Sequence, residues 1–338
     1  FSGMMMPFMQ FIGNLGYVMV ALLGGYLTMI GRIQVGQIQS FFQYIRNFTQ
    51  PMQQIAQVSN MLQSSAAAAE RVFEFLEEKE EDQVVKNPVD IRKTKGIVDF
   101  ENVQFGYNEE QMIIHNFSSH VGEGQKVAIV GPTGAGKTTM IKLLMRFYDV
   151  NKGSIKIDGH DLREFNRTEL RELFGMVLQD TWLFNGTIME NIRYGRLDAT
   201  DEEVIQAAKA AHVHHFIMTQ PEGYQMVLNE ETSNISQGQK QLLTIARAIL
   251  ADNKIMILDE ATSSVDTRTE VQIQKAMDTL MKGRTSFVIA HRLSTIRDSD
   301  LILVMKDGDI IEQGNHETLL KQKGFYAQLY NSQFEKAL

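Results

Sequence analysis

The first part of the chain carries no charge over a length that few soluble folds contain. Residues 4–30 hold no Asp, Glu, Lys, Arg or His, and no acidic residue appears before Glu70. About 20 mainly apolar residues in a helix suffice to cross the hydrocarbon core of a bilayer. We therefore expect a membrane-spanning helix here, although a buried helix of a large soluble protein would show the same pattern. Because the chain begins at Phe1 and no basic residue precedes the apolar run, we interpret it as a segment of a longer protein and not as a signal peptide.

A second long helix is predicted over residues 35–76, where Gly36 and Pro51 are the only strong breakers. Its first half is rich in polar side chains, among them Gln37, Arg46 and Gln50. Polar residues at membrane depth face a helix-bundle interior or an aqueous cavity. Periodicity alone leaves two alternatives open, a span that lines such a cavity and an amphipathic helix outside the membrane.

The distribution of charge divides the chain into parts. Residues 1–69 carry a net charge of +2 from Arg32 and Arg46. Since the whole chain has a net charge of −8, the remaining residues carry −10. The segment 77–95 is charge-rich and contains Asn87-Pro88, which is typical of a linker. We expect membrane helices over 1–76, a linker over 77–95 and a globular domain over 96–338. The negative balance disfavours a general nucleic-acid surface, and the absence of cysteine excludes disulfide, Cys-zinc and cysteine-nucleophile chemistry.

After the linker, apolar strand-like runs alternate with helical stretches. The predicted strands are Ile97–Phe100, Lys126–Val130, Ser154–Ile157, Gly175–Leu178, Lys254–Leu258, Thr285–Ala290, Leu301–Met305 and Asp309–Gln313. The predicted helices are Thr138–Phe147, Glu202–Ala211, Gln237–Leu250 and Thr269–Met281. Such alternation predicts an α/β fold around a largely parallel sheet.

A complete G-x-x-x-x-G-K-[ST] motif lies between the second predicted strand and the helix that follows it. The motif comprises Gly131, Pro132, Thr133, Gly134, Ala135, Gly136, Lys137 and Thr138, and Thr139 continues it. Glycines let backbone N–H groups turn towards a phosphate, and the helix N-terminus adds positive potential. Lys137 would supply charge to the β- and γ-phosphates, and the Thr138 hydroxyl would be a Mg²⁺ ligand. The strand–loop–helix context makes this a phosphate-binding P-loop.

Two acids end the apolar strand that reaches Leu258. Asp259 would hold Mg²⁺, and Glu260 would orient or deprotonate the attacking water. Adjacent residues at a strand end point in different directions, so the two carboxylates can divide these tasks. Strands often end in acids, and the P-loop earlier in the chain is what gives this pair its functional interpretation.

The stretch Asn234-Ile-Ser-Gln-Gly-Gln-Lys-Gln241 precedes a predicted helix and places Ser236, Gly238 and Gln239 at its start. It resembles the Leu-Ser-Gly-Gly-Gln signature of ATP-binding cassette (ABC) proteins. This copy departs from that pattern at Ile235 and at Gln237, which stands where the family has its first glycine.

Four further positions resemble ABC motifs in the expected order. Tyr107 is similar to the aromatic residue that stacks on adenine, and Gln179 to the glutamine that senses Mg²⁺ and the attacking water. Asp266 in Ser264-Val-Asp266 resembles the D-loop aspartate, and His291 the switch histidine that contacts the γ-phosphate. Taken singly, each of these residues would be read as an ordinary surface or strand-end side chain.

Together these features resemble the C-terminal part of a bacterial ABC exporter half-transporter. The resemblance implies a P-loop ATPase cassette with a helical subdomain, ATP and Mg²⁺ as ligands, a cytoplasmic cassette and a multi-pass membrane part with about four spans before Phe1. It also implies a second half-transporter, since each ATP would lie between the P-loop of one cassette and the signature of the other. The resemblance favours a membrane path lined by the Gln-rich helix.

Two alternatives to an exporter remain. A soluble ABC ATPase of DNA repair or translation would share the same cassette, and a regulatory module would bind ATP without hydrolysing it. The intact Glu260 and His291 argue against the latter. Because Gln237 would disturb both sites of a homodimer but one site of a heterodimer, we favour a heterodimer and keep the homodimer as the alternative. The transported compound, whether lipid, drug or peptide, is left open.

Overall fold

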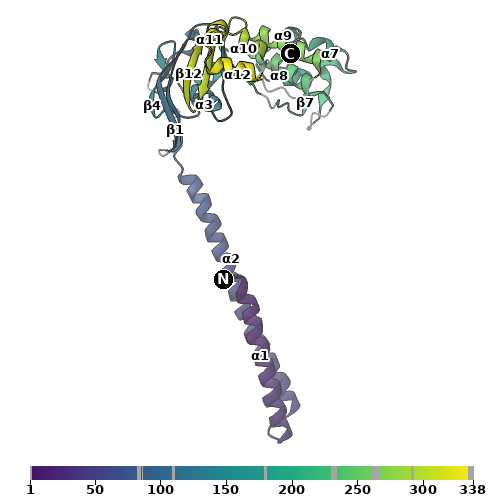
Figure 1. Ribbon diagram of the computed structural model, residues 1–338. Helices are drawn as coiled ribbons and strands as arrows, with labels where there is room; N and C mark the ends of the chain where they lie inside the picture. The colour runs from purple at the N-terminus through teal and green to yellow at the C-terminus, as the bar shows by residue number, and fades with distance from the viewer. Residues whose placement is uncertain are drawn as a thin grey trace. The chain divides into compact units, whose positions relative to one another are not determined.

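The structure is a computed structural model and describes residues 2–81, 85, 87–108, 111–178, 181–229, 234–259, 266–290 and 293–333 (Figure 1). The chain divides into two compact units, Phe1–Asp82 and Gln83–Leu338. Each unit is described here by itself.

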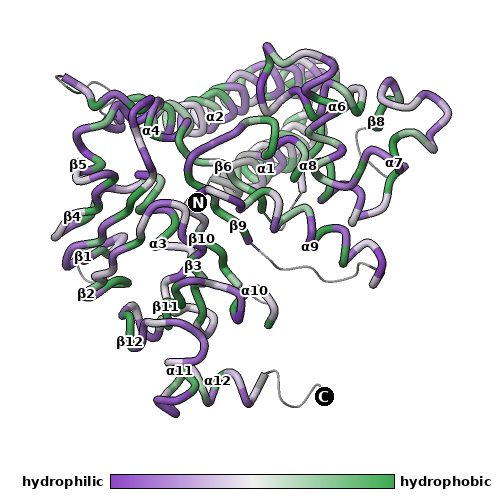
Figure 2. Tube along the Cα trace, turned by 90° about the horizontal axis from the view of Figure 1, so that it is seen from above, coloured by the Kyte–Doolittle hydropathy of each residue, from purple (hydrophilic) through white to green (hydrophobic). Residues whose placement is uncertain are grey.

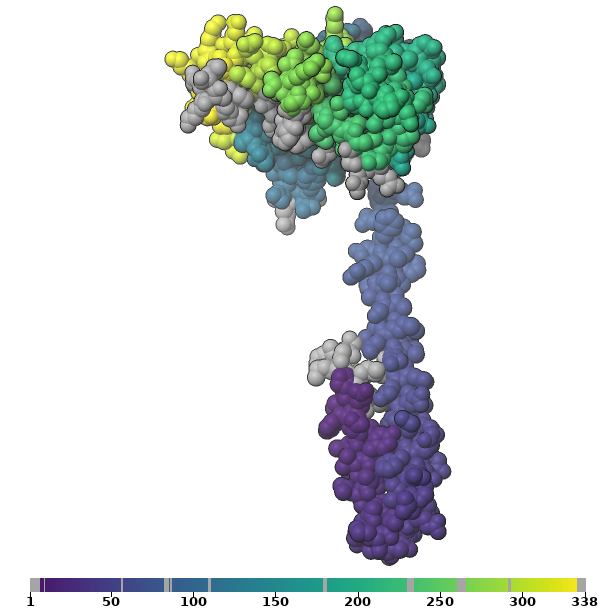
Figure 3. Space-filling model, turned by 90° about the vertical axis from the view of Figure 1, so that its right-hand side faces the viewer, coloured from purple at the N-terminus to yellow at the C-terminus, as the bar shows by residue number. Residues whose placement is uncertain are grey.

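The first unit is a hairpin of two long helices, α1 (Ser2–Met29) and α2 (Val35–Glu77). Figures 1 and 3 show α1 lying along α2. Tyr17 and Phe42 bring their ring centroids to 5.6 Å. A Cβ in place of Gly24 would lie 2.9 Å from Ile38 Cγ1, so this glycine allows the two helices to approach closely near the turn.

The two helices differ in their suitability as membrane spans. Within the described residues, α1 alone is long and apolar enough to cross a membrane, over Gln10–Met29. The glutamines of α2 lower its mean hydropathy, and this helix continues without a break through Pro51. A proline costs less in a long helix where neighbouring groups can satisfy the freed carbonyl.

The second unit is built around a ten-stranded sheet with the order β5-β4-β1-β2-β12-β11-β3-β10-β9-β6. Its strands are β1 (Val98–Asn108), β2 (Gln111–Val121), β3 (Lys126–Val130), β4 (Lys152–Ile157), β5 (His160–Asp161), β6 (Phe174–Val177), β9 (Ile255–Asp259), β10 (Thr285–Ile289), β11 (Leu301–Lys306) and β12 (Asp309–Gly314).

The sheet is mixed, and the expectation of a largely parallel sheet holds for one half of it. Strands β11, β3, β10, β9 and β6 pair in parallel. The pairs β1–β2, β1–β4, β4–β5 and β11–β12 are antiparallel. The second half differs because only two residues separate β1 from β2, β4 from β5 and β11 from β12, and strands joined by such short connections pair antiparallel. The ABC cassette fold, with a mixed sheet and a helical region, is otherwise as predicted.

Helices cover both faces of the parallel half. Val127 and Ile129 of β3 face the cluster that holds α3 (Lys137–Leu144), whereas Ala128 and Val130 pack with α10 (Leu293–Arg297), α11 (His316–Gln322) and α12 (Phe325–Gln333). This alternation follows from the two-residue period of a strand. Because both faces are covered, β10 is buried along its whole length and β9 up to Asp259, and the apolar run of β9 is coloured mostly green in Figure 2.

The remaining elements form a helical region and short connections. The helical region has its own core, formed by α5 (Ile188–Arg193), α6 (Asp201–Ala210), α7 (His214–Met218), α8 (Gln237–Ala251) and α9 (Thr267–Met281). Shorter pieces are η1 (Ile91–Lys93), η2 (Leu162–Glu164), α4 (Arg167–Glu172), β7 (Gly186–Thr187), η3 (Gly223–Gln225) and β8 (Val227–Leu228).

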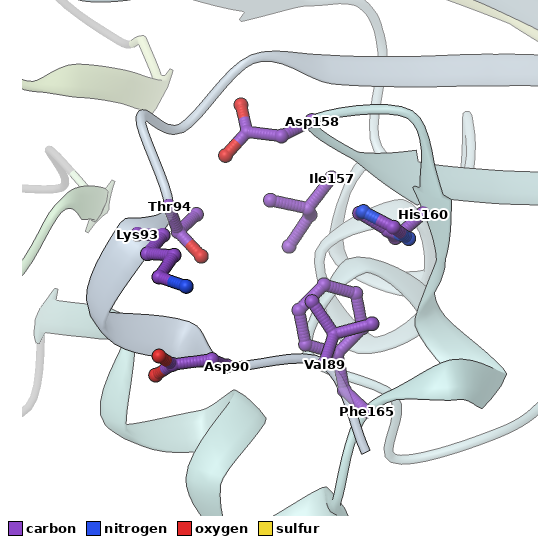
Figure 4. A pocket seen from close by; sticks show the side chains of 8 residues that line it. All are labelled: Val89, Asp90, Lys93, Thr94, Ile157, Asp158, His160 and Phe165. Atoms are coloured by element: carbon purple, nitrogen blue, oxygen red, sulfur yellow. The ribbon is translucent and has the colours of Figure 1, made fainter. Parts of the chain in front are cut away.

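The end of the predicted linker is fastened to the cassette at the β4–β5 turn. The Asp158 carboxylate accepts hydrogen bonds from the backbone N–H of Lys95 at 2.6 Å and of Ile97 at 2.9 Å. Figure 4 shows the surface pocket beside this clamp, lined by Val89, Asp90, Lys93, Thr94, Ile157, Asp158, His160 and Phe165. The clamp fixes where the chain enters the sheet.

Candidate nucleotide-binding site

The P-loop has the backbone that phosphate binding requires. It begins where β3 ends and runs into α3, whose N-cap is Gly136 with a φ of +97°. Gly131 has a φ of +151°, and a Cβ there would collide with the Met305 carbonyl oxygen. Since only glycine adopts such angles at little cost, these two positions hold the loop in its cradle conformation.

Lys137 is directed back over the loop. Its ammonium donates to the carbonyl oxygens of Gly131 at 2.6 Å and Pro132 at 2.9 Å. Burial lowers the pKa of Lys137, and the nearby carboxylate of Asp259 opposes that shift. The predicted phosphate-binding lysine and the predicted metal-binding aspartate are therefore close enough to interact electrostatically.

A cavity of about 440 Å³ brings most of the predicted phosphate and metal residues together. The described residues that line it are Ile113, Thr133, Gly134, Ala135, Gly136, Lys137, Thr138, Thr139, Asp259 and Ile289. The lining includes a hydroxyl and a carboxylate, which are oxygen ligands of the kind that Mg²⁺ uses together with nucleotide phosphates. Thr138 and Asp259 thus fit a magnesium ion bound with a nucleotide.

Tyr107 lies beside the helix that follows the P-loop. Its hydroxyl is 3.4 Å from the Thr139 hydroxyl, and the residue is 43% exposed, which leaves surface for a ligand. Tyr148 supports the ring edge-on with centroids 5.1 Å apart. Sequence reasoning missed Tyr148, because no motif marks a second aromatic residue after α3.

Strand order explains why the other predicted residues belong to the same edge. Neighbouring parallel strands β3, β10, β9 and β6 have their carboxyl ends on one side of the sheet. Gln179, Glu260 and His291 follow β6, β9 and β10 closely in the sequence. These three residues lie outside the described residues, as do Ser264 and Val265, so their side-chain positions stay predictions.

The signature stretch begins a helix at a different place. Ser236 is the N-cap of α8, its hydroxyl accepts from the Gln239 backbone N–H at 3.3 Å, and its own N–H donates to the Gln239 side chain at 2.9 Å. Ser236, Gly238 and Gln239 are not among the described residues that line the P-loop cavity. The structure therefore does not bring these three predicted nucleotide ligands to the P-loop of their own chain.

Gln237 and Asp266 have local roles in this chain. Gln237 is the first helical residue of α8 and donates from Nε2 to the Thr181 hydroxyl at 3.2 Å. Its backbone is not left-handed, so the backbone freedom of a glycine is not required there. The Asp266 carboxylate caps α9 by accepting from the Thr269 N–H at 3.0 Å, and this bond lowers the pKa of Asp266.

Three features define the cassette ATPase class. They are a strand–P-loop–helix unit, a carboxylate at the end of the next-but-one strand of the sheet, and a helical region that carries the signature. Residues 114–263 match the family model described as ABC transporter. The chain belongs to the ABC transporter family, and its second unit is an ABC ATPase domain, which implies that it binds nucleotide.

The whole chain is similar in sequence to named transport proteins. It is 52% identical over 335 residues to the uncharacterized ABC transporter ATP-binding protein YfiC of Bacillus subtilis (strain 168), covering 99% of the chain and 56% of that protein. It is 53% identical over 328 residues to a fatty acid ABC transporter ATP-binding/permease protein of Mycobacterium bovis, covering 97% of the chain and 52% of that protein. The chain spans about half the length of the curated relatives it matches.

Two further comparisons extend the likeness to exporters and flippases. An ATP-dependent lipid A-core flippase of Syntrophus aciditrophicus is 41% identical over 330 residues, covering 98% of the chain and 55% of the flippase. Among solved structures, a bacterial Atm1-family ABC exporter with ATP bound is similar with a TM-score of 0.72 and 38% identity. That match covers 96% of the chain and 57% of the exporter chain. These likenesses include the helical hairpin as well as the cassette.

Proposed function

We propose that the chain is the C-terminal part of a half-transporter that uses ATP to export a compound across a membrane. The observation that carries the proposal is the cavity where Lys137, Thr138 and Asp259 meet, in a chain whose first unit contains an apolar span. Export proteins among the relatives support this assignment. The protein would be multi-pass in the cell membrane, with the cassette in the cytoplasm.

ATP binding follows from the groups on this chain. The loop from Gly131 to Thr139 holds the phosphates through its backbone N–H groups, and Lys137 neutralises charge on the β- and γ-phosphates. Tyr107 stacks on the adenine. Thr138 and Asp259 would hold Mg²⁺, which would neutralise the charge that develops on the phosphates.

Hydrolysis is assigned to the residues at the neighbouring strand ends. Glu260 would orient or deprotonate the attacking water, Gln179 would position that water and help to hold Mg²⁺, and His291 would contact the γ-phosphate. Support comes from the strand order, which places the carboxyl ends of β9, β6 and β10 along one edge with the P-loop.

The signature residues would act on the ATP of a second cassette. Ser236, Gly238 and Gln239 begin α8 away from the P-loop cavity of their own chain, and the N-terminus of a helix attracts anions. Asp266 would contact the opposite site from the start of α9. We propose that two half-transporters close on two ATP molecules, and that this closure moves the membrane helices.

A heterodimer is our preferred assembly, and the structure changes the reason for it. The backbone at Gln237 is helical and does not require glycine, so backbone strain no longer supports a heterodimer. The size of the Gln237 side chain, which would crowd the nucleotide of a partner cassette, still supports it. The test compares the ATPase rate of full-length protein purified alone and with its co-encoded neighbour. If the protein alone shows full activity that Gln237→Gly does not change, the unequal-site proposal is wrong.

Transport is tested with the full-length protein in inside-out vesicles. We expect ATP-dependent accumulation of cargo that is lost in Lys137→Ala, together with retention of the protein in the membrane fraction after a high-salt wash. Recovery of an active ATPase in the soluble fraction would instead favour the alternative, a soluble ABC-type ATPase of DNA repair or translation.

A further inference from the structure

A polar groove runs between α1 and α2 within the apolar hairpin. It measures about 550 Å³ and is lined by Gln10, Gly13, Asn14, Tyr17, Arg46, Thr49, Gln50 and Gln53. On each helix these residues follow the i, i+3, i+4, i+7 spacing of a single face. The groove is therefore a continuous feature of the hairpin and not a chance gap between two side chains.

The groove lies at the level of the apolar span. Gly13 is next to Thr49, and Gly16 is next to Ile45, so the contacts place Arg46 opposite residues 13–16 of α1. Those residues lie inside the candidate span Gln10–Met29. An arginine at such a level is expensive, and ionisable residues within membrane segments usually serve a function.

The charge of Arg46 is not balanced by an acid of its own hairpin. Residues 1–69 contain no Asp or Glu, and Glu70 is 24 residues further along α2, or about 36 Å at 1.5 Å per residue. The other polar groups that line the groove are amides, a phenol and the Thr49 hydroxyl. The amides and the phenol can donate hydrogen bonds, whereas the Thr49 hydroxyl donates to the Ile45 carbonyl oxygen at 2.9 Å. Such a set of donors around one cation matches an anion.

Polar side chains line both walls of the groove, and apolar side chains flank the wall that α1 forms. On α2, Gln43, Asn47 and Gln54 continue the polar face outward from Arg46. On α1, Phe11 and Val18 are the helix neighbours of Asn14, three and four residues away, and they are 64% and 57% exposed. An anionic head group between the polar side chains of the two helices and an apolar chain against the flanking side chains of α1 would satisfy both kinds of surface.

We propose that this groove binds the anionic head group of an amphiphilic cargo, with Arg46 as its counter-charge and the amides of Gln10, Asn14 and Gln50 as hydrogen-bond donors. This proposal rests on the proposed export function and names the class of its cargo. The head group is a carboxylate or a phosphate, because either accepts the paired donors of a guanidinium. The apolar chain lies against Phe11 and Val18.

The test uses the full-length protein, with its partner where one is required, in phosphatidylcholine vesicles. The ATPase rate is measured against increasing oleate, oleyl alcohol and oleoyl lysophosphatidate, which share one apolar chain and differ in the head group. We expect half-maximal stimulation at a concentration at least tenfold lower for oleate or lysophosphatidate than for oleyl alcohol. The more potent anion identifies the head group as a carboxylate or a phosphate.

Variants connect that preference to the groove. Arg46→Ala should raise the half-maximal concentration of the preferred anion by about tenfold to a hundredfold, the range for a lost hydrogen bond to a charged group. Arg46→Lys should keep part of the preference, since it keeps the charge and loses the fork geometry. Arg32→Ala is the matched control, because Arg32 is the other cation of residues 1–69 and lies in the turn between the helices. It should behave as the wild type.

Three results would overturn the proposal. Equal potency of oleyl alcohol and oleate in the wild type would show that the head group is not read. An unchanged preference in Arg46→Ala would assign the anion to another site. A lower unfolding temperature in Arg46→Ala, restored by Arg46→Lys, with all three compounds affected equally, would make Arg46 a structural ion-pair partner of another helix.

If Arg46→Ala does not fold, Gln50→Leu takes its place and should raise the anion's half-maximal concentration several-fold. A wild type without any ATPase activity would instead refute the proposed export function.

Discussion

The conformation of Gly136 gives a prediction whose magnitude follows from the structure. Gly136 has a φ of +97°, and a Cβ built on it lies 2.8 Å from Ile114 Cδ1, which belongs to a buried side chain. Gly283 has a similar φ of +74°, but its Cβ would meet nothing within 4 Å. The pair therefore separates backbone strain from steric overlap.

Left-handed strain costs about 1–2 kcal/mol in either alanine variant, and overpacking at Ile114 adds about 1–3 kcal/mol to Gly136→Ala. At about 2–4 °C per kcal/mol for a domain of this size, Gly283→Ala should lower the unfolding temperature by about 2–8 °C. Gly136→Ala should lower it by about 4–20 °C. Gly136→Ala should also weaken binding of a fluorescent ATP analogue, whereas Gly283→Ala should not.

The assay is thermal unfolding of the full-length protein, followed by titration with the analogue at a temperature where every variant is folded. If the two variants unfold at the same temperature and bind nucleotide equally, the packing of the P-loop against Ile114 has been misjudged.

Three further predictions concern single side chains. Lys137→Ala should weaken ATP binding by about tenfold to a hundredfold, because it removes a partly buried charge from the phosphates; wild-type affinity in a nucleotide titration would contradict the P-loop assignment. Tyr107→Ala should cost about 1–3 kcal/mol of binding through lost stacking, and Tyr107→Trp should keep it, which the same titration checks. Burial lowers the pKa of His316, which shares a hydrogen bond of 2.7 Å with the Tyr326 hydroxyl. The unfolded chain then binds more protons at this residue, so cassette stability should fall as the pH drops through the ordinary histidine pKa. His316→Gln should remove part of that fall in pH-dependent unfolding, and an unchanged pH profile would show that His316 does not contribute.

The sequence was most informative where local chemistry and strand burial agree. The predicted strand Lys126–Val130 is β3 without change, because an apolar run followed by a glycine-rich loop has few alternatives. The predicted strand ending at Leu258 is β9, displaced by one residue, and Asp259 ends it beside the P-loop.

The antiparallel half of the sheet was harder to predict for a physical reason. Strand β1 extends to Asn108 rather than ending at Phe100, and its pairing with β2 shifts register at several points after Phe100. Bulges of this kind interrupt the two-residue alternation from which strands are recognised. Polar residues on the exposed side of β2, such as Asn116 and Ser118, weakened the pattern further.

The site itself could be predicted only in part from one chain. Lys137, Thr138 and Asp259 lie together because a single sheet edge carries them. Ser236 and Asp266 cap helices within this chain, and a nucleotide role for either requires a surface that another cassette must supply. No pattern within a single sequence encodes the position of a second molecule.

We propose that the P-loop cavity binds ATP and that Glu260, the acid after Asp259, drives ATP hydrolysis. Phosphate release and ATP binding, measured for the full-length protein and its Glu260→Gln variant under the same conditions, test both roles. We predict that Glu260→Gln binds ATP as tightly as the wild type and releases phosphate about 10²–10⁴ times more slowly. Phosphate release by Glu260→Gln at the wild-type rate would contradict the account.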